Sequence, residues 1–255
     1  MSADKAKTFA ALHVKGNPLV LYNIWDAGSA KAVAEAGAPA LATGSWSVAA
    51  AHGYADGESI PLDLVETVTA RITATVDLPL TVDFESGYAL DAEAVAANVL
   101  RIIKAGAVGI NFEDSFDNES RMHSVERQVA CIKAIRAMAL AEGVPLFINA
   151  RNDYFLAETN AERHPDLMPD AIARGLAYTE AGADGFFVPG LATENLIAEI
   201  CGAIALPVNI TAMSTAASTE TLARLGVARI SHGPRPYRKA MAAIKDAAAS
   251  VYGAA

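Results

Sequence analysis

Cysteine is scarce in this chain of 255 residues, which contains only Cys131 and Cys201. The two lie far apart, and each falls within a stretch that we expect to be helical. Two cysteines at this spacing argue against a disulfide framework and against a zinc site of the Cys-x-x-Cys type. We therefore predict two buried thiols with no chemical role.

Long apolar runs and an excess of positive charge are also missing. No segment approaches the roughly 18 apolar residues that a membrane-spanning helix needs, and the opening stretch MSADKAKTFAALHVKGNP lacks the order of a secretory signal. The formal net charge of -9 argues against a protein that holds nucleic acid through many phosphate contacts. We expect a cytoplasmic protein with neither a membrane nor a nucleic-acid partner. An anionic substrate would then need local positive charge from Arg, Lys or a metal.

No linker rich in Pro, Gly or Ser divides the chain, and no Gly-x-Gly-x-x-Gly follows its first predicted strand. The first absence predicts a single domain over residues 1–255. The second argues against a doubly wound dinucleotide-binding sheet. Hydrophobic residues make up 53% of the chain, as expected of a globular enzyme with a large core.

Two recurring phrases divide the chain into alternating helices and strands. Ala-Gly-Ala ends a helical pattern in AEAGAPALATG, IKAGAVGINFED and TEAGADGFFVPG, with glycine as the helix stop. Proline opens a strand in LPLTVDF, VPLFINAR and LPVNITAM, where its missing N–H costs the sheet nothing. The predicted strands are 19–24, 40–44, 79–84, 108–113, 145–150, 185–189, 207–211 and 228–231. Apolar strands alternating with helices predict an α/β fold, a (β/α)8 TIM barrel, with a doubly wound open sheet as the alternative.

Polar residues follow the predicted strands, at the end of the barrel where such enzymes keep their active sites. Residues two apart on a strand share a face. Three pairs are therefore expected to point into the barrel mouth: Asp83 with Glu85, Asn111 with Glu113, and Asn149 with Arg151.

Three acids in one barrel mouth need a counter-charge. Two carboxylates about 5 Å apart repel by roughly 3 kcal/mol at an effective dielectric of 20, and Arg151 offsets only part of this. Oxygen ligands without a His or Cys cluster favour Mg²⁺, or Mn²⁺, as the metal of Asp83, Glu85 and Glu113. Because Mg²⁺ keeps several waters, we expect Asp83 to bind it directly and Glu85 and Glu113 to hold its waters. The alternative is a buried acid network that Arg151 and backbone donors satisfy without a metal.

An ordered set of motifs spans nearly the whole chain: NIWDAGSAKAVAEAG, TGSWSVAAAHGYAD, VDFESGY, INFED, NARND and VNITAM. Together they resemble the isocitrate lyase and phosphoenolpyruvate mutase superfamily. The resemblance implies a (β/α)8 barrel that binds Mg²⁺ and an α-oxo or α-hydroxy carboxylate. It implies chemistry that makes or breaks a C–C or P–C bond next to that group. It also implies a homo-oligomer, a tetramer or dimer, whose last helix packs on a neighbouring subunit.

The resemblance assigns metal and catalytic roles to the acidic motifs. Asp83 and Glu85 match the family's acidic pair, and Glu113 matches the Glu of its strand-four Glu-Asp. Arg151 matches the strand-five arginine, a catalytic and substrate-binding residue. Asp56 falls at the acid of the loop that reaches over the metal's water shell in relatives.

The same resemblance identifies a substrate-binding set. Gly44, Ser45 and Trp46 match the segment whose backbone amides hold the substrate carboxylate, and Asp83 joins them. Asn209 matches a strand-seven asparagine that binds the substrate carboxylate in the lyases.

Two segments depart from the C–C lyases of the family. Those enzymes have a Lys-Arg-Cys-Gly-His loop after strand four, whose Cys protonates the product. Here the loop reads ESRMH, which puts Arg121 at the Cys position and His123 at the His position. At strand six the lyases have Pro-Glu, whereas this chain has Pro189 and Gly190. His123 becomes the candidate general acid or base because its ordinary pKa lies near neutrality, and the alternative is an exposed loop histidine.

Three functions remain. The favoured one is an Mg²⁺-dependent lyase that cleaves or decarboxylates a small 2-oxo or 2-hydroxy carboxylate next to a pyruvyl enolate, which the metal and Arg151 stabilise. The second is P–C chemistry, as in a phosphonomutase or phosphonopyruvate hydrolase, with phosphoryl partners at Asn118, Ser120 and Arg121. The third is a non-catalytic barrel that binds an oxo acid.

Overall fold

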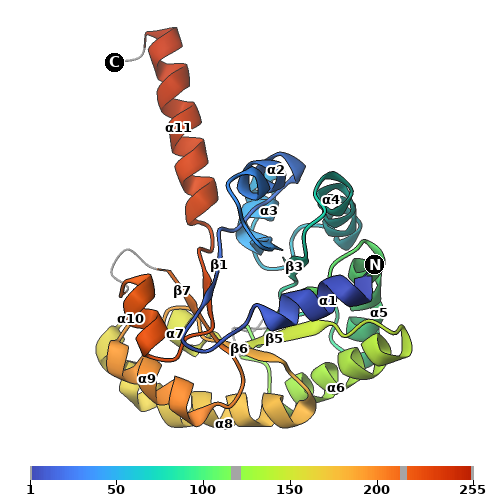
Figure 1. The fold of residues 1–255 in the computed structure, drawn as a ribbon, viewed down its shortest axis with the longest axis vertical. Coiled ribbons are helices and arrows are strands. Elements are labelled where there is room, and N and C mark those ends of the chain that lie inside the picture. Colours follow the sequence, from blue (N-terminus) through green and yellow to red (C-terminus); the bar gives the residue numbers. More distant parts are fainter. Residues whose placement is uncertain (1, 116–121, 213–216, 254–255) are drawn as a thin grey trace.

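Eight short parallel strands form one curled sheet in the computed structural model, which describes residues 2–115, 122–212 and 217–253 (Figure 1). The strand order is β1-β8-β7-β6-β5-β4-β3-β2, and a bridge between Ile24 and Thr43 links the two edges of the sheet. The strands are β1 (Leu19–Leu21), β2 (Leu41–Ala42), β3 (Leu80–Asp83), β4 (Gly109–Glu113), β5 (Phe147–Arg151), β6 (Gly185–Phe187), β7 (Val208–Thr211) and β8 (Arg229–Ser231). The predicted (β/α)8 barrel is confirmed. Each strand overlaps its predicted range and is shorter than predicted, and β5 ends one residue later than predicted, at Arg151.

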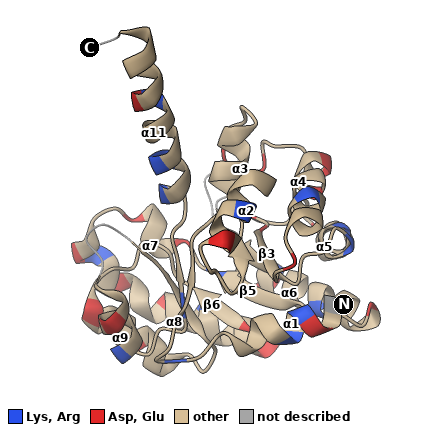
Figure 2. Cartoon of the chain, turned by 45° about the horizontal axis from the view of Figure 1, so that its top comes forward, with Lys and Arg blue, Asp and Glu red and all other residues tan. Residues whose placement is uncertain are grey.

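Helices surround the sheet and alternate with its strands along the chain. They are α1 (Ser2–Ala11), α2 (Ala27–Glu35), α3 (Ser45–Ala51), α4 (Leu62–Thr75), α5 (Ala92–Lys104), α6 (Val125–Ala141), α7 (Tyr154–Ala157), α8 (His164–Ala181), α9 (Glu194–Ala203), α10 (Thr219–Arg224) and α11 (Arg235–Tyr252), with a 3-10 turn η1 (Ala161–Arg163) before α8. Most pack against the barrel, whereas α11 projects away from it (Figure 1). Charged residues of both signs lie on outer helices such as α1, α4, α9 and α11 (Figure 2).

The recurring Ala-Gly-Ala phrases act as the helix stops that the sequence predicted. Gly37, Gly106 and Gly182 follow or cap α2, α5 and α8 with φ of 93°, 104° and 105°, in the left-handed region. Glycine adopts this region at little cost, so each helix ends there and the chain turns back into the next strand.

Both cysteines are buried and free, Cys131 in α6 and Cys201 in α9, as predicted. Burial raises the pKa of both thiols, which keeps them protonated and unreactive. Within residues 2–115, 122–212 and 217–253, no helix has the length and apolar character that crossing a membrane requires. The single-domain organisation and the cytoplasmic location stay predictions.

Helix α1 covers the end of the barrel where the strands begin. Phe9 meets Phe147, the first residue of β5, edge to face at 5.5 Å between ring centroids. His13 stacks on the same Phe147 ring at 4.0 Å, and its Nδ1 lies 2.8 Å from the Phe9 carbonyl oxygen. Since that oxygen accepts, Nδ1 donates. Burial is the main reason that the pKa of His13 falls to about 3, with the charge of Arg229 as a smaller cause.

His13 is expected to make stability depend on pH. Between pH 6.5 and about 3 the unfolded chain binds a proton at this histidine that the folded chain does not, so acid favours unfolding. Each pH unit below 6.5 should cost about 1.4 kcal/mol of unfolding free energy. Between pH 7 and pH 5, His13→Leu should therefore lose about 2 kcal/mol less stability than the native protein in urea unfolding. Equal losses in both proteins would contradict this assignment.

Candidate active site

The strands end around a cavity of about 270 Å³ at the barrel mouth. Its size suits a small metabolite, because pockets for drug-sized ligands start near 300 Å³. Six residues that the sequence predicted for the site line it: Gly44, Ser45, Trp46, Asp56, Asp83 and Arg151. Four others do not line it: Glu85, Glu113, His123 and Asn209.

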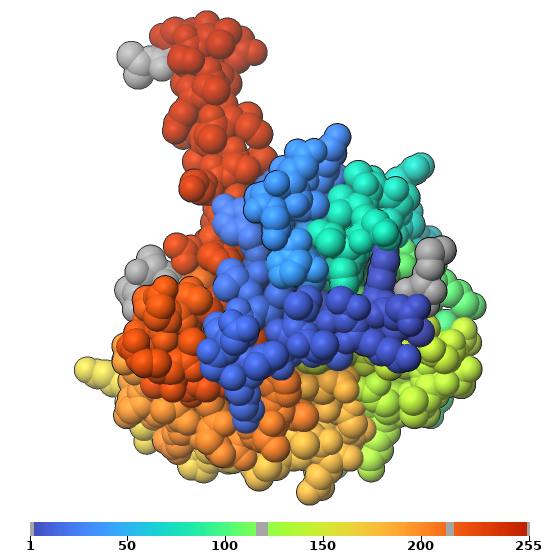
Figure 3. All heavy atoms as spheres, in the orientation of Figure 1, coloured from blue at the N-terminus to red at the C-terminus, as the bar shows by residue number. Residues whose placement is uncertain are grey.

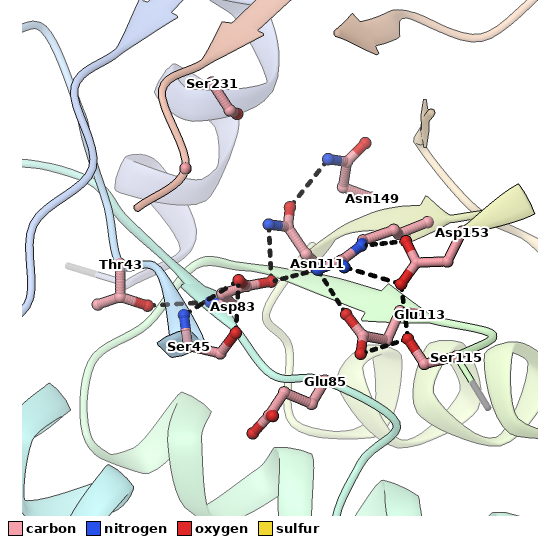
Figure 4. A network of polar contacts seen from close by, with 12 residues as sticks. Thr43, Ser45, Asp83, Glu85, Asn111, Glu113, Ser115, Asn149, Asp153 and Ser231 are labelled. Carbon is pink, nitrogen blue, oxygen red and sulfur yellow. Dashed lines mark hydrogen bonds and ion pairs between the residues drawn. The ribbon is translucent and has the colours of Figure 1, made fainter. Parts of the chain in front are cut away.

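Asp83 ends β3 and is held by hydrogen bonds from the first residue of α3 and from β4. Its Oδ2 accepts from the Ser45 backbone N–H at 3.1 Å and from the Ser45 hydroxyl at 3.0 Å. Its Oδ1 accepts from Nδ2 of Asn111 at 3.1 Å (Figure 4). The carboxylate therefore has a fixed orientation at the cavity wall.

Arg151 ends β5 and carries the positive charge of the cavity. Its Nη1 lies 2.5 Å from Glu113 Oε2, and its Nε lies 2.5 Å from Asp153 Oδ1. The distance from Nη1 to Asp83 Oδ1 is longer, 3.8 Å. Glu113 and Asp153 therefore hold the Arg151 guanidinium in place, and it lies beside Asp83 at the cavity wall.

The acids behind Arg151 share a hydroxyl. Ser115 Oγ lies 2.5 Å from Glu113 Oε1 and 2.7 Å from Asp153 Oδ2. A hydroxyl donates one hydrogen, so this arrangement favours a proton on one of the two acids. Burial raises the pKa of Glu113 well above its ordinary value, while Arg151 acts in the opposite direction. Glu113 therefore positions Arg151 and does not reach the cavity itself.

Glu85 does not share a face with Asp83, and that prediction was wrong. Strand β3 ends at Asp83, and Glu85 follows with φ of 50°, in the left-handed region, so the alternation of a strand no longer applies. Its Oε1 accepts from the backbone N–H groups of Gly57 and Glu58 at 2.9 and 2.8 Å, and its Oε2 accepts from the Tyr88 hydroxyl at 2.6 Å. Figure 4 shows its carboxylate outside the network around Asp83.

Glu85 is expected to hold the loop that carries Asp56. Glu85→Gln keeps an oxygen for the two N–H groups, and burial already raises the pKa of this carboxyl to about 7, so the neutral amide should fold with stability close to native. Glu85→Ala leaves two N–H groups without their acceptor and should cost about 2 kcal/mol. Urea unfolding and hydrogen exchange at residues 56–58 measure both effects. Unchanged exchange in Glu85→Ala would contradict the role.

A hydrated Mg²⁺ fits these acids better than a metal enclosed by protein ligands. Within the described parts of the chain, no three His, Cys, Asp or Glu side chains form a metal-binding group. A carboxylate offers about four lone-pair sites, and Asp83 uses three for hydrogen bonds. Mg²⁺ commonly takes one or two carboxylates and keeps several waters. Asp83 is therefore the residue that would hold the ion.

Asp56 and Trp46 complete the side of the cavity next to Asp83. The pKa of Asp56 is raised, first by partial burial of its carboxyl and then by the charge of Asp83. This repulsion is what a cation between the two acids would relieve. The Trp46 ring stacks under the guanidinium of Arg238 at 4.6 Å, so its indole packs against the start of α11.

His123 lies where the chain returns from the loop after β4, and its backbone is anchored. Its N–H donates to the Asp114 carbonyl oxygen at 3.3 Å, and its own carbonyl accepts from Arg174 at 2.9 Å. Arg174 also pairs with the fully buried Asp114 carboxylate at 3.0 Å. Asn118, Ser120 and Arg121, the predicted phosphoryl partners, lie outside the described residues.

Asn209 is buried below the cavity. It exchanges hydrogen bonds with the Ser231 hydroxyl at 3.2 and 3.3 Å, and Ser231 itself lines the cavity together with Thr211. The cavity floor on β7 and β8 is therefore formed by hydroxyl groups, with Asn209 behind them.

Gly190 explains why the strand-six Glu of the lyases has no counterpart here. Its φ is 87°, and a Cβ at this position would lie 2.2 Å from the Phe155 carbonyl oxygen. The short helix α7 fills that space. Leu156 of α7 lines the cavity with Phe187 and Pro189, so this wall is apolar.

Sequence reasoning missed the apolar wall and the polar floor. Leu156 belongs to a short helix after β5 that no periodicity announces. Ser231 and Arg229 lie two apart in β8, and this polar spacing within RIS was the signal that could have placed both side chains inside the barrel.

Comparison with known proteins agrees with this geometry. The family model described as phosphoenolpyruvate phosphomutase matches residues 9–252. The 2-methylisocitrate lyase of Escherichia coli K12 is 32% identical over 213 residues, which cover 80% of this chain and 69% of the lyase.

Solved structures give the same answer. A structure from Burkholderia cenocepacia J2315, provisionally assigned as a phosphonomutase, is 46% identical, has a TM-score of 0.94 and matches 99% of this chain and 100% of its own. A phosphonopyruvate hydrolase in complex with oxalate and Mg²⁺ is 21% identical, with a TM-score of 0.84 over 98% of this chain and 88% of its own, and shares the fold. This chain therefore belongs to the isocitrate lyase and phosphoenolpyruvate mutase superfamily, a group of lyases and mutases built on a (β/α)8 barrel.

Proposed function

We propose that this protein is an Mg²⁺-dependent lyase that cleaves or decarboxylates a small 2-oxo or 2-hydroxy carboxylate next to a pyruvyl unit. The observation that carries the proposal is the pairing of Asp83 with Arg151 in the wall of one small cavity, with Arg151 Nη1 3.8 Å from Asp83 Oδ1. Asp83 would hold a cation, and Arg151 provides a fixed guanidinium. Together these two groups suit a substrate with adjacent carboxylate and oxo oxygens.

The chain's own residues would divide the work as follows. Arg151 donates hydrogen bonds to the oxo oxygen as negative charge develops there, and Glu113 and Asp153 keep its guanidinium in place. In the Gly44–Trp46 segment, the Gly44 and Ser45 N–H groups already donate to the Ile24 carbonyl and to Asp83, so the Trp46 N–H is the one that would hold the substrate carboxylate. Bound Mg²⁺ would add Lewis-acid stabilisation of the same developing charge. Asp56 and His123 are the residues proposed to carry a proton.

The apolar wall bears on the substrate. Leu156, Phe187 and Pro189 occupy the side of the cavity where the lyases of the family carry Glu. A small or apolar substituent fits this wall better than an additional carboxylate, because an unpaired charge there would be desolvated.

P–C bond chemistry is the second candidate. It is favoured by the relative of 46% identity, which is provisionally assigned as a phosphonomutase. In this case the substrate would be phosphonopyruvate or phosphoenolpyruvate, and the loop after β4 would supply the phosphoryl partners.

A substrate panel in Mg²⁺ separates these functions. Isocitrate, 2-methylisocitrate, 2,3-dimethylmalate, oxaloacetate and phosphonopyruvate are incubated with the protein, and pyruvate, glyoxylate, CO₂ and phosphate are measured. The lyase proposal expects a carbonyl product or CO₂ from one of the carboxylates. Turnover of phosphonopyruvate alone would replace it with the second candidate, and oxo-acid binding without any turnover would replace it with a non-catalytic barrel.

We also propose a homo-oligomer, a tetramer or dimer, in which α11 packs on a neighbouring subunit. Figure 3 shows α11 extending beyond the body of the molecule, and Ile244, Val251 and Tyr252 on it are 60%, 79% and 83% exposed. A second copy of the chain would cover these apolar groups. Light scattering of the native chain is expected to give a multiple of 26.5 kDa, and a monomeric mass would contradict the proposal.

A further inference from the structure

Arg229 lies in the middle of the barrel and forms no ion pair within the described residues. The residue belongs to β8 and is 0% exposed. The charge of Asp83 acts on it only from a longer distance, and its Nη1 has no hydrogen-bond partner among the described residues. Burial lowers its pKa to about 9, so the guanidinium is still charged at neutral pH. A buried cation without an ion-pair partner lowers the stability of the fold, and such a group calls for a functional explanation.

The two groups that Arg229 contacts both line the cavity. Its Nη2 donates to Asn111 Oδ1 at 3.1 Å, and its Nε donates to the Ser231 hydroxyl oxygen at 3.3 Å. Arg229 therefore sits directly behind the cavity floor and joins β8 to β4 across the barrel.

The contact with Asn111 fixes which way its amide points. Guanidinium groups only donate, so the atom of Asn111 that faces Arg229 must be the oxygen. Nδ2 of Asn149 donates to that same oxygen at 2.9 Å. Nδ2 of Asn111 is thereby turned toward the cavity, where it donates to Asp83 Oδ1. The flipped amide would place an N–H₂ group against two donors and an oxygen against a carboxylate.

We propose that Arg229 is a positioning residue of the site, which orients the Asn111 amide and through it the Asp83 carboxylate that faces metal and substrate. This inference rests on the proposed oxo-acid site. Arg229 itself does not line the cavity, so its effect on binding passes through Asn111.

A double-mutant cycle on ligand binding tests the proposal. The affinity of oxalate in saturating Mg²⁺ is measured by calorimetry for the native protein, Arg229→Met, Asn111→Ala and the double variant. Each single variant is expected to bind oxalate about tenfold more weakly. The double variant should match Asn111→Ala within about twofold, because the contact through which Arg229 acts is already gone. Additive losses, or an Arg229→Met variant that binds like the native protein, would overturn the proposal.

Two further variants provide a substitute for Arg229→Met and a control for the loss of a partly buried arginine. Arg229→Lys retains the charge without the planar fork and should bind oxalate with intermediate affinity; it replaces Arg229→Met in the cycle if the latter does not fold. Arg136→Met is the matched control, since Arg136 pairs with Asp184 and the Gly182 carbonyl away from the cavity and should leave oxalate binding unchanged.

The double-mutant cycle tests the role of Arg229, and the substrate panel tests the lyase activity, so the two proposals can be overturned independently. Coupling in the cycle with an inactive panel would retain the role of Arg229 and overturn only the lyase. Turnover in the panel without coupling would overturn only the role of Arg229. A native protein that binds no oxalate in Mg²⁺ would overturn both.

Discussion

Asp83→Asn is expected to abolish Mg²⁺ binding and to slow turnover roughly 10³-fold. The amide has nearly the shape of the carboxylate, so Ser45 keeps an acceptor, but the negative charge that would hold the ion is gone. Stability should change little, because the repulsion from Asp56 is relieved while the Asn111 N–H₂ group loses its acceptor. Calorimetric Mg²⁺ titration and the rate on the best substrate of the panel measure the two effects.

Asp63→Asn is the matched control for this variant. Asp63 is an exposed acid of α4 with a side chain 88% accessible, and it pairs with Arg101 and does not line the cavity. It should bind Mg²⁺ and turn over substrate like the native protein. If Asp83→Asn also bound Mg²⁺ with native affinity, the ion would have to sit elsewhere and the assignment of Asp83 would be wrong.

Arg151→Lys is expected to reduce kcat by roughly 10² to 10³ while the protein stays folded. A lysine keeps the charge, but its single ammonium cannot contact Glu113 and Asp153 while also reaching the substrate oxygen. Arg151→Met should in addition lower the unfolding free energy by about 3–5 kcal/mol, because it leaves buried acids without their cation. Steady-state kinetics and urea unfolding separate the two consequences.

Arg136→Lys provides the comparison for Arg151. This variant also replaces an arginine by lysine. Arg136 forms a partly buried ion pair with Asp184, and this pair does not face the cavity. Native kinetics in Arg136→Lys and a loss in Arg151→Lys would assign the effect to the site. A native kcat in Arg151→Lys would show that the guanidinium does not act on the developing charge.

The sequence predicted the barrel well because its signals are local and repeated. Ala-Gly-Ala marks helix ends through a left-handed glycine, and the apolar runs between such stops are strands buried on both faces. The same logic placed Asp83 and Arg151 at the ends of β3 and β5, facing one cavity. Strand ends in a barrel converge, so residue type and position were sufficient there.

Prediction failed where the backbone leaves the strand. Glu85 is only two residues beyond Asp83, but its left-handed φ turns it toward the loop at Gly57 and Glu58. The apolar wall depends on α7, whose Leu156 reaches the cavity only because Gly190 has no side chain. Arg229 was missed because an arginine inside a barrel runs against the expectation of an apolar interior, and its meaning depends on contacts across the barrel with Asn111.

The central claim is that Asp83 and Arg151, side by side in the cavity wall, together hold a metal-chelated oxo acid. Crystals grown with Mn²⁺ and oxalate test it most directly, since Mn²⁺ is visible by its anomalous scattering. We predict one strong anomalous peak at bonding distance from the Asp83 carboxylate, with oxalate lying between that peak and the Arg151 guanidinium. A peak at Glu85 or elsewhere, or oxalate bound away from Arg151, would contradict the account.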